Sequence, residues 1–220
     1  MEEQHIKFSK SSIFVPFLLV FICWFVYWLE YYFHTNFNKH GIYPLKISGL
    51  QGVLFSPFIH SDTKHLFNNS VPLFTTLWAL FYFYKRVALR ILIIGTIFTG
   101  LLTWFYARPA YHIGASGVVY LLVSFLFFSG IFRKYYRLIA LSLAIVFLYG
   151  SMIWYVFPVE DGISWEGHLS GFVVGFIFSI FYRKIGPQKP HFVYTENEEF
   201  EKLFDQDGNF IPPENDKTTD

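Results

Sequence analysis

Residues 114–132 read GASGVVYLLVSFLFFSGIF, an apolar run of membrane-spanning length that opens on a glycine-flanked serine, Ser116. About 20 such residues cross the hydrocarbon core of a bilayer. Another apolar run, 166–183, opens on His168 within the sequence GHLSG. Polar side chains at membrane depth are costly and usually face a protein interior or a water-filled cavity. We therefore expect Ser116 and His168 to face the interior of a bundle of membrane helices.

The composition of the whole chain is that of a membrane protein. Of its 220 residues, 54% are hydrophobic and only 15% are charged, and phenylalanine alone occurs 29 times. A soluble domain has a different balance. The apolar segments long enough to span a bilayer are 12–33, 66–84, 88–106, 114–132, 136–157 and 166–183, of which the second and sixth are interrupted by polar residues. The sequence predicts an all-α polytopic protein with six transmembrane helices.

The basic residues predict the orientation of these spans. If the connections alternate between two sides, the N-terminal side holds eleven of them: Lys7, Lys10, Lys85, Arg86, Arg90, Arg133, Lys134, Arg137, Arg183, Lys184 and Lys189. The other side holds Lys39, Lys46, Lys64 and Arg108. The positive-inside rule then places both termini in the cytoplasm, and Ser116 and His168 near the outer face. With a net charge of +1 and no other basic stripe, a nucleic-acid partner is not expected.

Three regions flank or interrupt the spans. Residues 1–11 are polar and precede a full-length span without a cleavage site, so we expect a cytoplasmic N-terminus and an uncleaved first helix. Residues 34–59 are too apolar for a solvated loop and too rich in glycine and proline for a span, which favours an interfacial or partly membrane-embedded hairpin. Residues 186–220 form an acidic cytoplasmic tail, largely disordered, with a short amphipathic helix predicted after Thr195. The membrane domain is then 12–185.

The serine of the GASG sequence has two interpretations. Small residues are common in membrane helices because they let helices pack closely, and that alone explains the pattern. In the functional interpretation, Ser116 is a nucleophile in the first turn of a helix, where free N–H groups and the positive helix end stabilise a developing oxyanion. Gly114 belongs to this stabilising end, and both Gly114 and Gly117 would let a substrate backbone approach.

His168 is the candidate general base. A histidine in a membrane helix can simply bond a neighbouring helix, but here glycines recur every four residues, at Gly167, Gly171 and Gly175. This bare face favours close packing against the start of the Ser116 helix, within reach of the serine hydroxyl. Glu166 falls on a different helix face from His168, so the sequence predicts a dyad and no acidic third member.

A third motif, HxxxxHxxxN, contains His60, His65 and Asn69. His65 and Asn69 share a helix face, and two N–H donors on one face suit an oxyanion clamp. The alternatives are a histidine cap with an asparagine bonded to a neighbouring backbone, or a zinc site. Zinc is disfavoured because no HExxH, cysteine ligand or acidic third ligand accompanies the histidines, and we expect neither metal nor cofactor. His60 lies ahead of the span and is expected to anchor the 34–59 region.

Together, these motifs resemble those of the rhomboid intramembrane serine proteases, over about 12–185. The resemblance implies a nucleophilic Ser116, a general base His168, and oxyanion stabilisation by His65, Asn69 and the Ser116 N–H. It also implies supporting contacts, in which Tyr120 packs against the catalytic histidine and Gly171 and Gly175 let the last helix pack near the fourth. Two departures stand out: Gln51 and Gly52 replace a usual Trp-Arg, and Tyr84 stands where many relatives have glutamate.

The function that this resemblance implies is cleavage of single-span membrane proteins near the outer membrane boundary. The partners would be membrane proteins with a transmembrane helix, within the lipid bilayer. A competing class is a catalytically inactive rhomboid-like protein that binds transmembrane helices, which loss of Ser116 or His168 would have favoured. A third is a small transporter that uses its histidines, whose function would survive Ser116→Ala.

Overall fold

The computed structural model describes residues 8–160, 162–189 and 197–211, in two units, 1–189 and 190–220. The elements, in chain order, are α1 (Ser11–Tyr32), η1 (Asn38–His40), η2 (Ile47–Gln51), α2 (Gly52–Phe55), η3 (Ser56–Phe58), α3 (Thr63–Phe83), α4 (Ala88–Tyr106), α5 (Ser116–Arg133), α6 (Tyr136–Tyr149), η4 (Gly150–Val156), α7 (Trp165–Phe181) and α8 (Glu198–Glu201). Isolated β-bridges join Ile42 to His112 and Phe204 to Phe210, and the described ranges contain no longer strand. The predicted all-helical class is confirmed.

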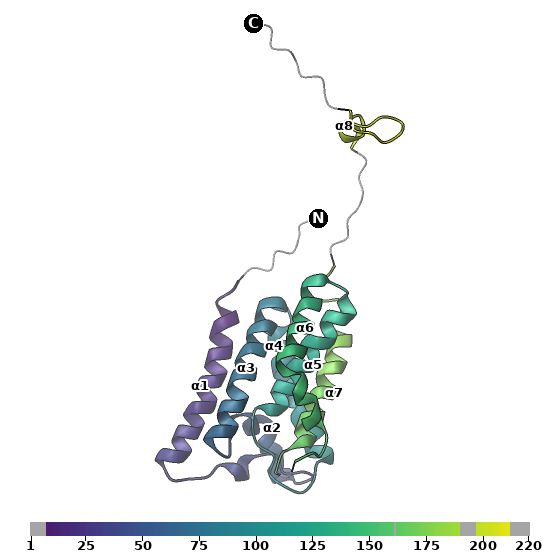
Figure 1. Ribbon diagram of the computed structural model, residues 1–220. Helices are drawn as coiled ribbons and strands as arrows, with labels where there is room; N and C mark the ends of the chain where they lie inside the picture. Colours follow the sequence, from purple (N-terminus) through teal and green to yellow (C-terminus); the bar gives the residue numbers. More distant parts are fainter. Residues whose placement is uncertain (1–7, 161, 190–196, 212–220) are drawn as a thin grey trace. The chain divides into compact units, whose positions relative to one another are not determined.

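Helix α5 is the centre of the first unit. It packs against α3, α4, α6 and α7, and Figure 1 shows these helices running side by side with α1. Of its most apolar stretch, 61% is buried, against 17% for α1 and for the α6–η4 segment. The outer helices expose large apolar side chains, such as Phe147 at 88%. Lipid is the solvent that suits such a surface, so the chain is an integral membrane protein.

Within the described ranges, four helical segments are long and apolar enough to cross a membrane: Ser11–Tyr32, Ala88–Tyr106, Ser116–Arg133 and Tyr136–Val156. The two remaining predicted spans correspond to α3 and α7. Helix α3 carries polar residues along its N-terminal half, and α7 has only 17 residues. Both nevertheless pack directly against α5. The count of six spans stays a prediction.

Several helix boundaries differ from those predicted. Helix α3 begins at Thr63 and not at 66, because the Asp62 carboxylate caps it by accepting the His65 N–H at 2.8 Å. Helix α5 begins at Ser116 and not at 114, since Gly114 has a φ of +105°. The predicted 136–157 helix is α-helical only to Tyr149 and then narrows to the 3₁₀ segment η4. Helices α1 and α7 end one and two residues before the predicted limits, 33 and 183.

Residues 34–59 do not form the predicted hairpin. They form the short helices η1, η2, α2 and η3, of which η2 and α2 pack against α4, and η3 packs against α1 and α5. Backbone bonds between Ile42 and His112, at 3.0 and 2.8 Å, join this segment to the connection before α5. The chain is too rich in glycine and proline for one helix, yet helical turns satisfy its backbone groups locally. The predicted membrane embedding of this segment stays a prediction.

The acidic tail is described only in part. Helix α8 covers Glu198–Glu201, within the region predicted to form a short amphipathic helix. A turn follows, in which the Asp205 carboxylate accepts the N–H groups of Asp207 and Asn209 at 2.9 and 2.8 Å. Residues 1–7, 190–196 and 212–220, including Thr195, lie outside the described residues. The predictions of a cytoplasmic N-terminus and a largely disordered tail are therefore untested.

Candidate active site

The first turns of α5 and α7 come together through glycines. A Cβ on Gly171 would overlap the Gly117 carbonyl oxygen, and one on Gly175 would overlap the Leu121 carbonyl oxygen. The two helices therefore pack backbone against backbone, as the repeated glycines of the α7 sequence predict. Because Ser116 begins α5 and His168 lies in the first turn of α7, this packing brings the two side chains to the same level of the bundle.

The serine and histidine are in hydrogen-bonding contact. His168 Nε2 lies 2.9 Å from Ser116 Oγ, and His168 Nδ1 lies 2.8 Å from the Tyr155 carbonyl oxygen. A carbonyl can only accept, so Nδ1 carries the ring proton and Nε2 accepts the serine O–H. This is the protonation state that a general base requires. The Tyr155 carbonyl orients the imidazole, and no carboxylate bonds it within the described residues.

Aromatic packing holds the imidazole in place. The Tyr120 ring stacks on the His168 ring, with centroids 4.3 Å apart and planes 14° apart. The Tyr120 hydroxyl donates to the Met152 carbonyl at 2.6 Å. Tyr120 therefore fixes the histidine against α5 and ties η4 to the same helix. The spacing of four residues between Ser116 and Tyr120 places both on one face of α5.

His65 and Asn69 lie beside the segment that precedes the serine. A Cβ on Gly114 would lie 2.8 Å from His65 Nε2 and 3.7 Å from Asn69 Nδ2, so both side chains face the segment before Ser116. Asn69 Nδ2 donates one hydrogen to the His65 carbonyl at 3.1 Å and keeps a second. His65 Nδ1 lies 3.2 Å from Ser61 Oγ. The Ser61 hydroxyl donates its single hydrogen to the Asp62 carboxylate at 2.7 Å, so Ser61 Oγ accepts from His65 Nδ1, and the neutral His65 ring presents an unprotonated Nε2 to the site.

The amides before Ser116 are already bonded. The Gly114 N–H donates to the Ser56 carbonyl at 2.9 Å, and the Ala115 N–H donates to His60 Nε2 at 3.4 Å. Burial lowers the pKa of His60 to about 4, so the ring is neutral and accepts. Gly114 thus contributes its backbone conformation and not its N–H. The Ser116 N–H, in the first turn, has no partner within the described residues.

A cavity of about 750 Å³ covers the serine and histidine. Its walls come from α3, from η4 and from the segment before α7, and include His65, Asn69, Tyr155, Ser116 and His168. Cavities of about 300–1,000 Å³ are typical of small-ligand sites, and this one has room for a short stretch of extended peptide. Within the described residues, no group of three or more His, Cys, Asp or Glu is arranged to hold a metal ion.

Some contacts of the site leave little trace in the sequence. The Tyr155 carbonyl is a backbone group, which any residue supplies, and its position depends on the 3₁₀ segment η4. Glu166, considered only as a third acid, is 2% exposed and pairs with Arg108 at 3.3 Å. Glu166 lies directly before Gly167 and His168 in an apolar segment, and a buried carboxylate requires a partner. This position is the one feature of the sequence that points to the ion pair.

Comparison with known proteins identifies the family. The Rhomboid domain pattern matches residues 48–185, so the chain belongs to the rhomboid family. Uncharacterized protein Rv1337 of Mycobacterium tuberculosis (strain ATCC 25618 / H37Rv) is 36% identical over 157 residues, covering 65% of this chain and 63% of that protein. Uncharacterized protein ML1171 of Mycobacterium leprae (strain TN) is 30% identical over 152 residues, covering 64% and 60%. The match thus spans less than two thirds of these relatives.

Proposed function

We propose that the protein is an intramembrane serine endopeptidase that cleaves single-span membrane proteins with a Ser116–His168 dyad. The observation that carries the proposal is the 2.9 Å contact between Ser116 Oγ and a histidine nitrogen whose partner on the other side is a carbonyl. His168 Nε2 takes the serine proton while Oγ attacks the peptide carbonyl. The same nitrogen then protonates the leaving amine, and water attacks the acyl-enzyme with His168 again as base.

The tetrahedral intermediates need donors for their oxyanion. The Ser116 N–H and the second Asn69 amide hydrogen supply them in this proposal, and His65 adds a donor only when its ring is protonated at Nε2 as well as at Nδ1. A substrate helix must unwind locally to expose its peptide bond, since helical hydrogen bonds shield it. Glycine or proline near the cleavage site lowers that cost. Membrane proteins with helix-breaking residues near the outer boundary are therefore the proposed substrates.

A fluorophosphonate probe tests the proposed chemistry directly. An activated serine attacks phosphorus, fluoride leaves, and the serine proton passes to the histidine. Purified protein in detergent should be labelled, and peptide mapping should find the adduct on Ser116. A folded protein that stays unlabelled, beside a rhomboid protease that labels, would instead support the inactive helix-binding protein.

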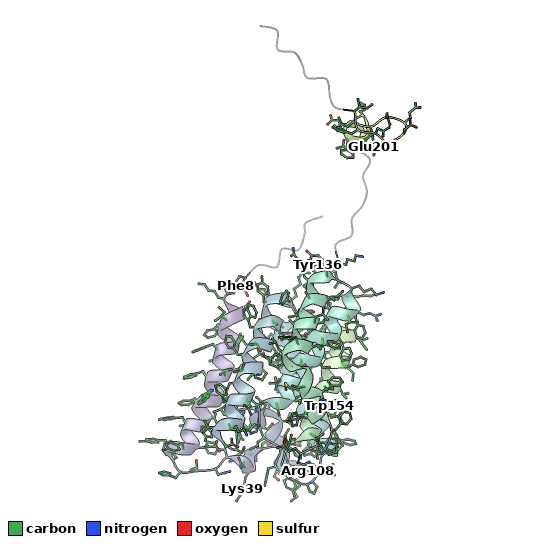
Figure 2. The ribbon with its side chains drawn as sticks, in the orientation of Figure 1. Phe8, Lys39, Arg108, Tyr136, Trp154 and Glu201 are labelled. Atoms are coloured by element: carbon green, nitrogen blue, oxygen red, sulfur yellow. The ribbon has the colours of Figure 1, made fainter. Side chains whose placement is uncertain are left out.

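The proposed orientation has both termini in the cytoplasm, six spans and a site open to the outer face. In Figure 2, Phe8 and Tyr136 lie at one end of the first unit, and Lys39 and Arg108 lie at the other. This separation supports the alternation of basic residues between the two sides.

The orientation predicts which introduced cysteines are accessible from outside. In a Cys23→Ala background, a membrane-impermeant thiol reagent on intact cells should label Lys39→Cys. It should label Lys85→Cys only after permeabilisation, because Lys85 follows α3 at the cytoplasmic end. The side chains of Lys39 and Lys85 are both exposed, so a cysteine at either position is equally accessible within the protein itself. The opposite pattern would reverse the proposed topology.

Removal of the asparagine donor should slow cleavage without unfolding the protein. Asn69→Ala is expected to lower the cleavage rate constant by about 10²-fold, the usual effect of losing one oxyanion donor. Asn68→Ala is the matched control, because Asn68 borders the same cavity but is exposed and sits on the adjacent helix position. We expect the control to stay within about 2-fold of wild type. Equal effects of both substitutions would remove Asn69 from the proposed clamp.

A further inference from the structure

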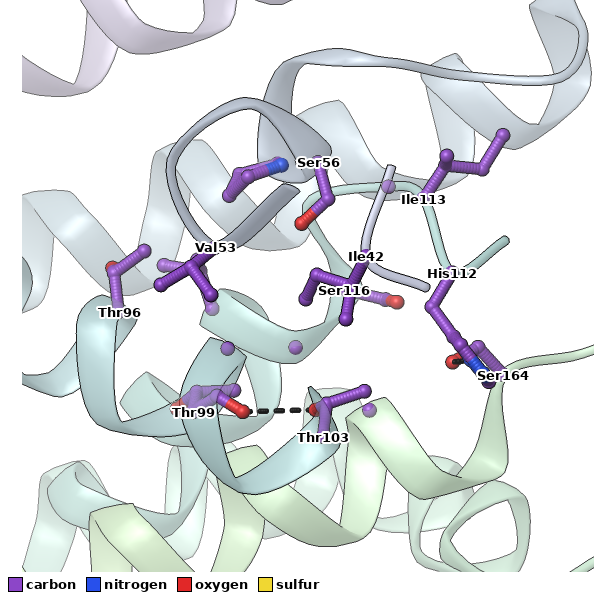
Figure 3. Close-up of a pocket in the computed structure, with 16 residues that line it drawn as sticks. Ile42, Val53, Ser56, Thr96, Thr99, Thr103, His112, Ile113, Ser116 and Ser164 are labelled. Carbon is purple, nitrogen blue, oxygen red and sulfur yellow. Dashed lines mark hydrogen bonds between the residues drawn. The ribbon is translucent and has the colours of Figure 1, made fainter. Parts of the chain in front are cut away.

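A second serine–histidine hydrogen bond lies beside the catalytic pair. His112 Nδ1 is 2.6 Å from Ser164 Oγ, and His112 Nε2 is 3.0 Å from the Arg108 carbonyl oxygen. Figure 3 shows His112 and Ser164 in contact on one side of Ser116. The two pairs join the same two segments in opposite order: His112 precedes Ser116 by four residues, and Ser164 precedes His168 by four. Two cross-links therefore join the start of α5 to the start of α7.

The second histidine is held in one protonation state. His112 is 4% exposed, and burial lowers its pKa below the usual value, although the Arg108 carbonyl and Glu166 oppose this and Arg108 reinforces it. The neutral ring donates from Nε2 to the Arg108 carbonyl and accepts the Ser164 O–H at Nδ1. The Ser164 carbonyl in turn accepts the His168 N–H at 3.2 Å. His112 thereby fixes the residue from which the first turn of α7 starts.

An ion pair strengthens the same connection. Arg108 Nη1 lies 3.3 Å from both carboxylate oxygens of Glu166, and the Arg108 backbone N–H donates to Oε1 at 3.2 Å. Arg108 Nη2 donates to the Ile163 carbonyl at 2.6 Å. Charge-assisted bonds to a buried carboxylate are strong and directional. Arg108 is thus bonded to residues on both sides of Ser164.

We propose that His112 and Arg108 are positioning residues, which set the separation of Ser116 and His168 by bonding the connection before α5 to the start of α7. This inference rests on the proposed function. The van der Waals contacts of the glycines between α5 and α7 have no directional preference, so they limit sliding of the helices poorly. The hydrogen bonds of His112 and Arg108 are directional and fix the position of one helix start relative to the other. A displacement of about 1 Å between nucleophile and base can cost about 10²-fold in rate.

Fluorophosphonate labelling kinetics test the inference. In Ser164→Ala, we expect the maximal rate constant of labelling to fall at least about 10-fold while the half-saturating probe concentration stays unchanged. Ser164→Thr keeps the hydroxyl and should restore most of the rate. His112→Phe keeps the ring volume but loses both bonds, and should match Ser164→Ala. The double variant should be no slower than His112→Phe, because that substitution already removes the Ser164–His112 bond.

The matched control is Ser142→Ala. Ser142 is a buried serine whose hydroxyl donates to the Phe127 carbonyl at 2.8 Å and so joins α6 to α5, about three helical turns along α5 from Ser116. It should lower Tm about as much as Ser164→Ala while leaving the labelling rate unchanged. The inference fails if Ser164→Ala labels like wild type, if Ser164→Thr is as slow as Ser164→Ala, or if the adduct maps to Ser164. An unlabelled wild-type protein would overturn the proposed function as well.

Discussion

Ser116→Ala should abolish fluorophosphonate labelling and lower cleavage of a single-span substrate in proteoliposomes by about 10⁴-fold or more. The residual rate would come only from binding and the oxyanion donors. His168→Ala should cost nearly as much, because a serine hydroxyl without its base is a poor nucleophile at neutral pH. The two residues act as one unit, so the double variant should be no slower than Ser116→Ala.

The control for this result is another serine on the same helix. Ser124 Oγ donates to the Phe172 carbonyl at 2.7 Å and so also joins α5 to α7, but it lies two turns further along the helix. Ser124→Ala should reduce stability slightly and leave labelling near the wild-type level. Cleavage that persists in Ser116→Ala would exclude the dyad. Function that survives there without any cleavage would instead favour the transporter hypothesis.

The residues of the candidate dyad can be located from the sequence because their types are costly inside a membrane. Ser116, His168, His65 and Asn69 stand out against apolar runs, and helix periodicity then predicts which of them share a face. The glycine spacing of 167–175 likewise predicts the close contact of α7 with α5. Both inferences need only local patterns, which is why the sequence suffices for them.

Other features depend on tertiary contacts that residue type does not reveal. Arg133 is an example: as a basic residue near a span end it indicates a cytoplasmic loop, yet it is 5% exposed. Its guanidinium donates to the Tyr182 and Ile185 carbonyls, both at 2.7 Å, at the end of α7. It also lies 5.1 Å from the Tyr84 ring centroid. The free carbonyls at a helix end can bind the cation of a basic side chain. The sequence alone does not tell whether such a side chain binds these carbonyls or is exposed to water.

The two departures from the usual rhomboid motifs also have structural explanations. Tyr84, where many relatives have glutamate, provides the aromatic face against the Arg133 guanidinium. Gly52, in the place of the usual arginine, passes so close to Ile42 that a Cβ would overlap the backbone there. At both positions, the contacts of this chain therefore differ from those that the usual family residues would make. Comparison of the motifs alone does not reveal the contacts that replace them.

Gly171→Ala should be among the most destabilising single substitutions in this protein. The added Cβ would meet the Gly117 carbonyl oxygen and lie 3.0 Å from the Leu121 nitrogen, and backbone atoms inside a helix cannot move aside. Overpacking of this kind costs about 1–3 kcal/mol, and contact with backbone favours the upper end. Separation of α7 from α5 would also draw His168 away from Ser116. We therefore expect a clear fall in Tm in detergent, with labelling of the folded fraction reduced at least about 10-fold.

Gly150→Ala is the matched control, because it adds the same methyl group where there is space. Gly150 has helical dihedral angles, φ −60° and ψ −31°, and a Cβ there would meet only Val146 Cγ1, at an ordinary 3.5 Å. Alanine reduces the entropy of the unfolded chain, so the free energy of unfolding should stay constant or rise by up to about 1 kcal/mol, and Tm should not fall. If Gly171→Ala kept both the wild-type Tm and labelling, α5 and α7 would not be in backbone contact. The 2.9 Å approach of Ser116 to His168 would then depend on the hydrogen bonds of His112 and Arg108 and not on glycine packing.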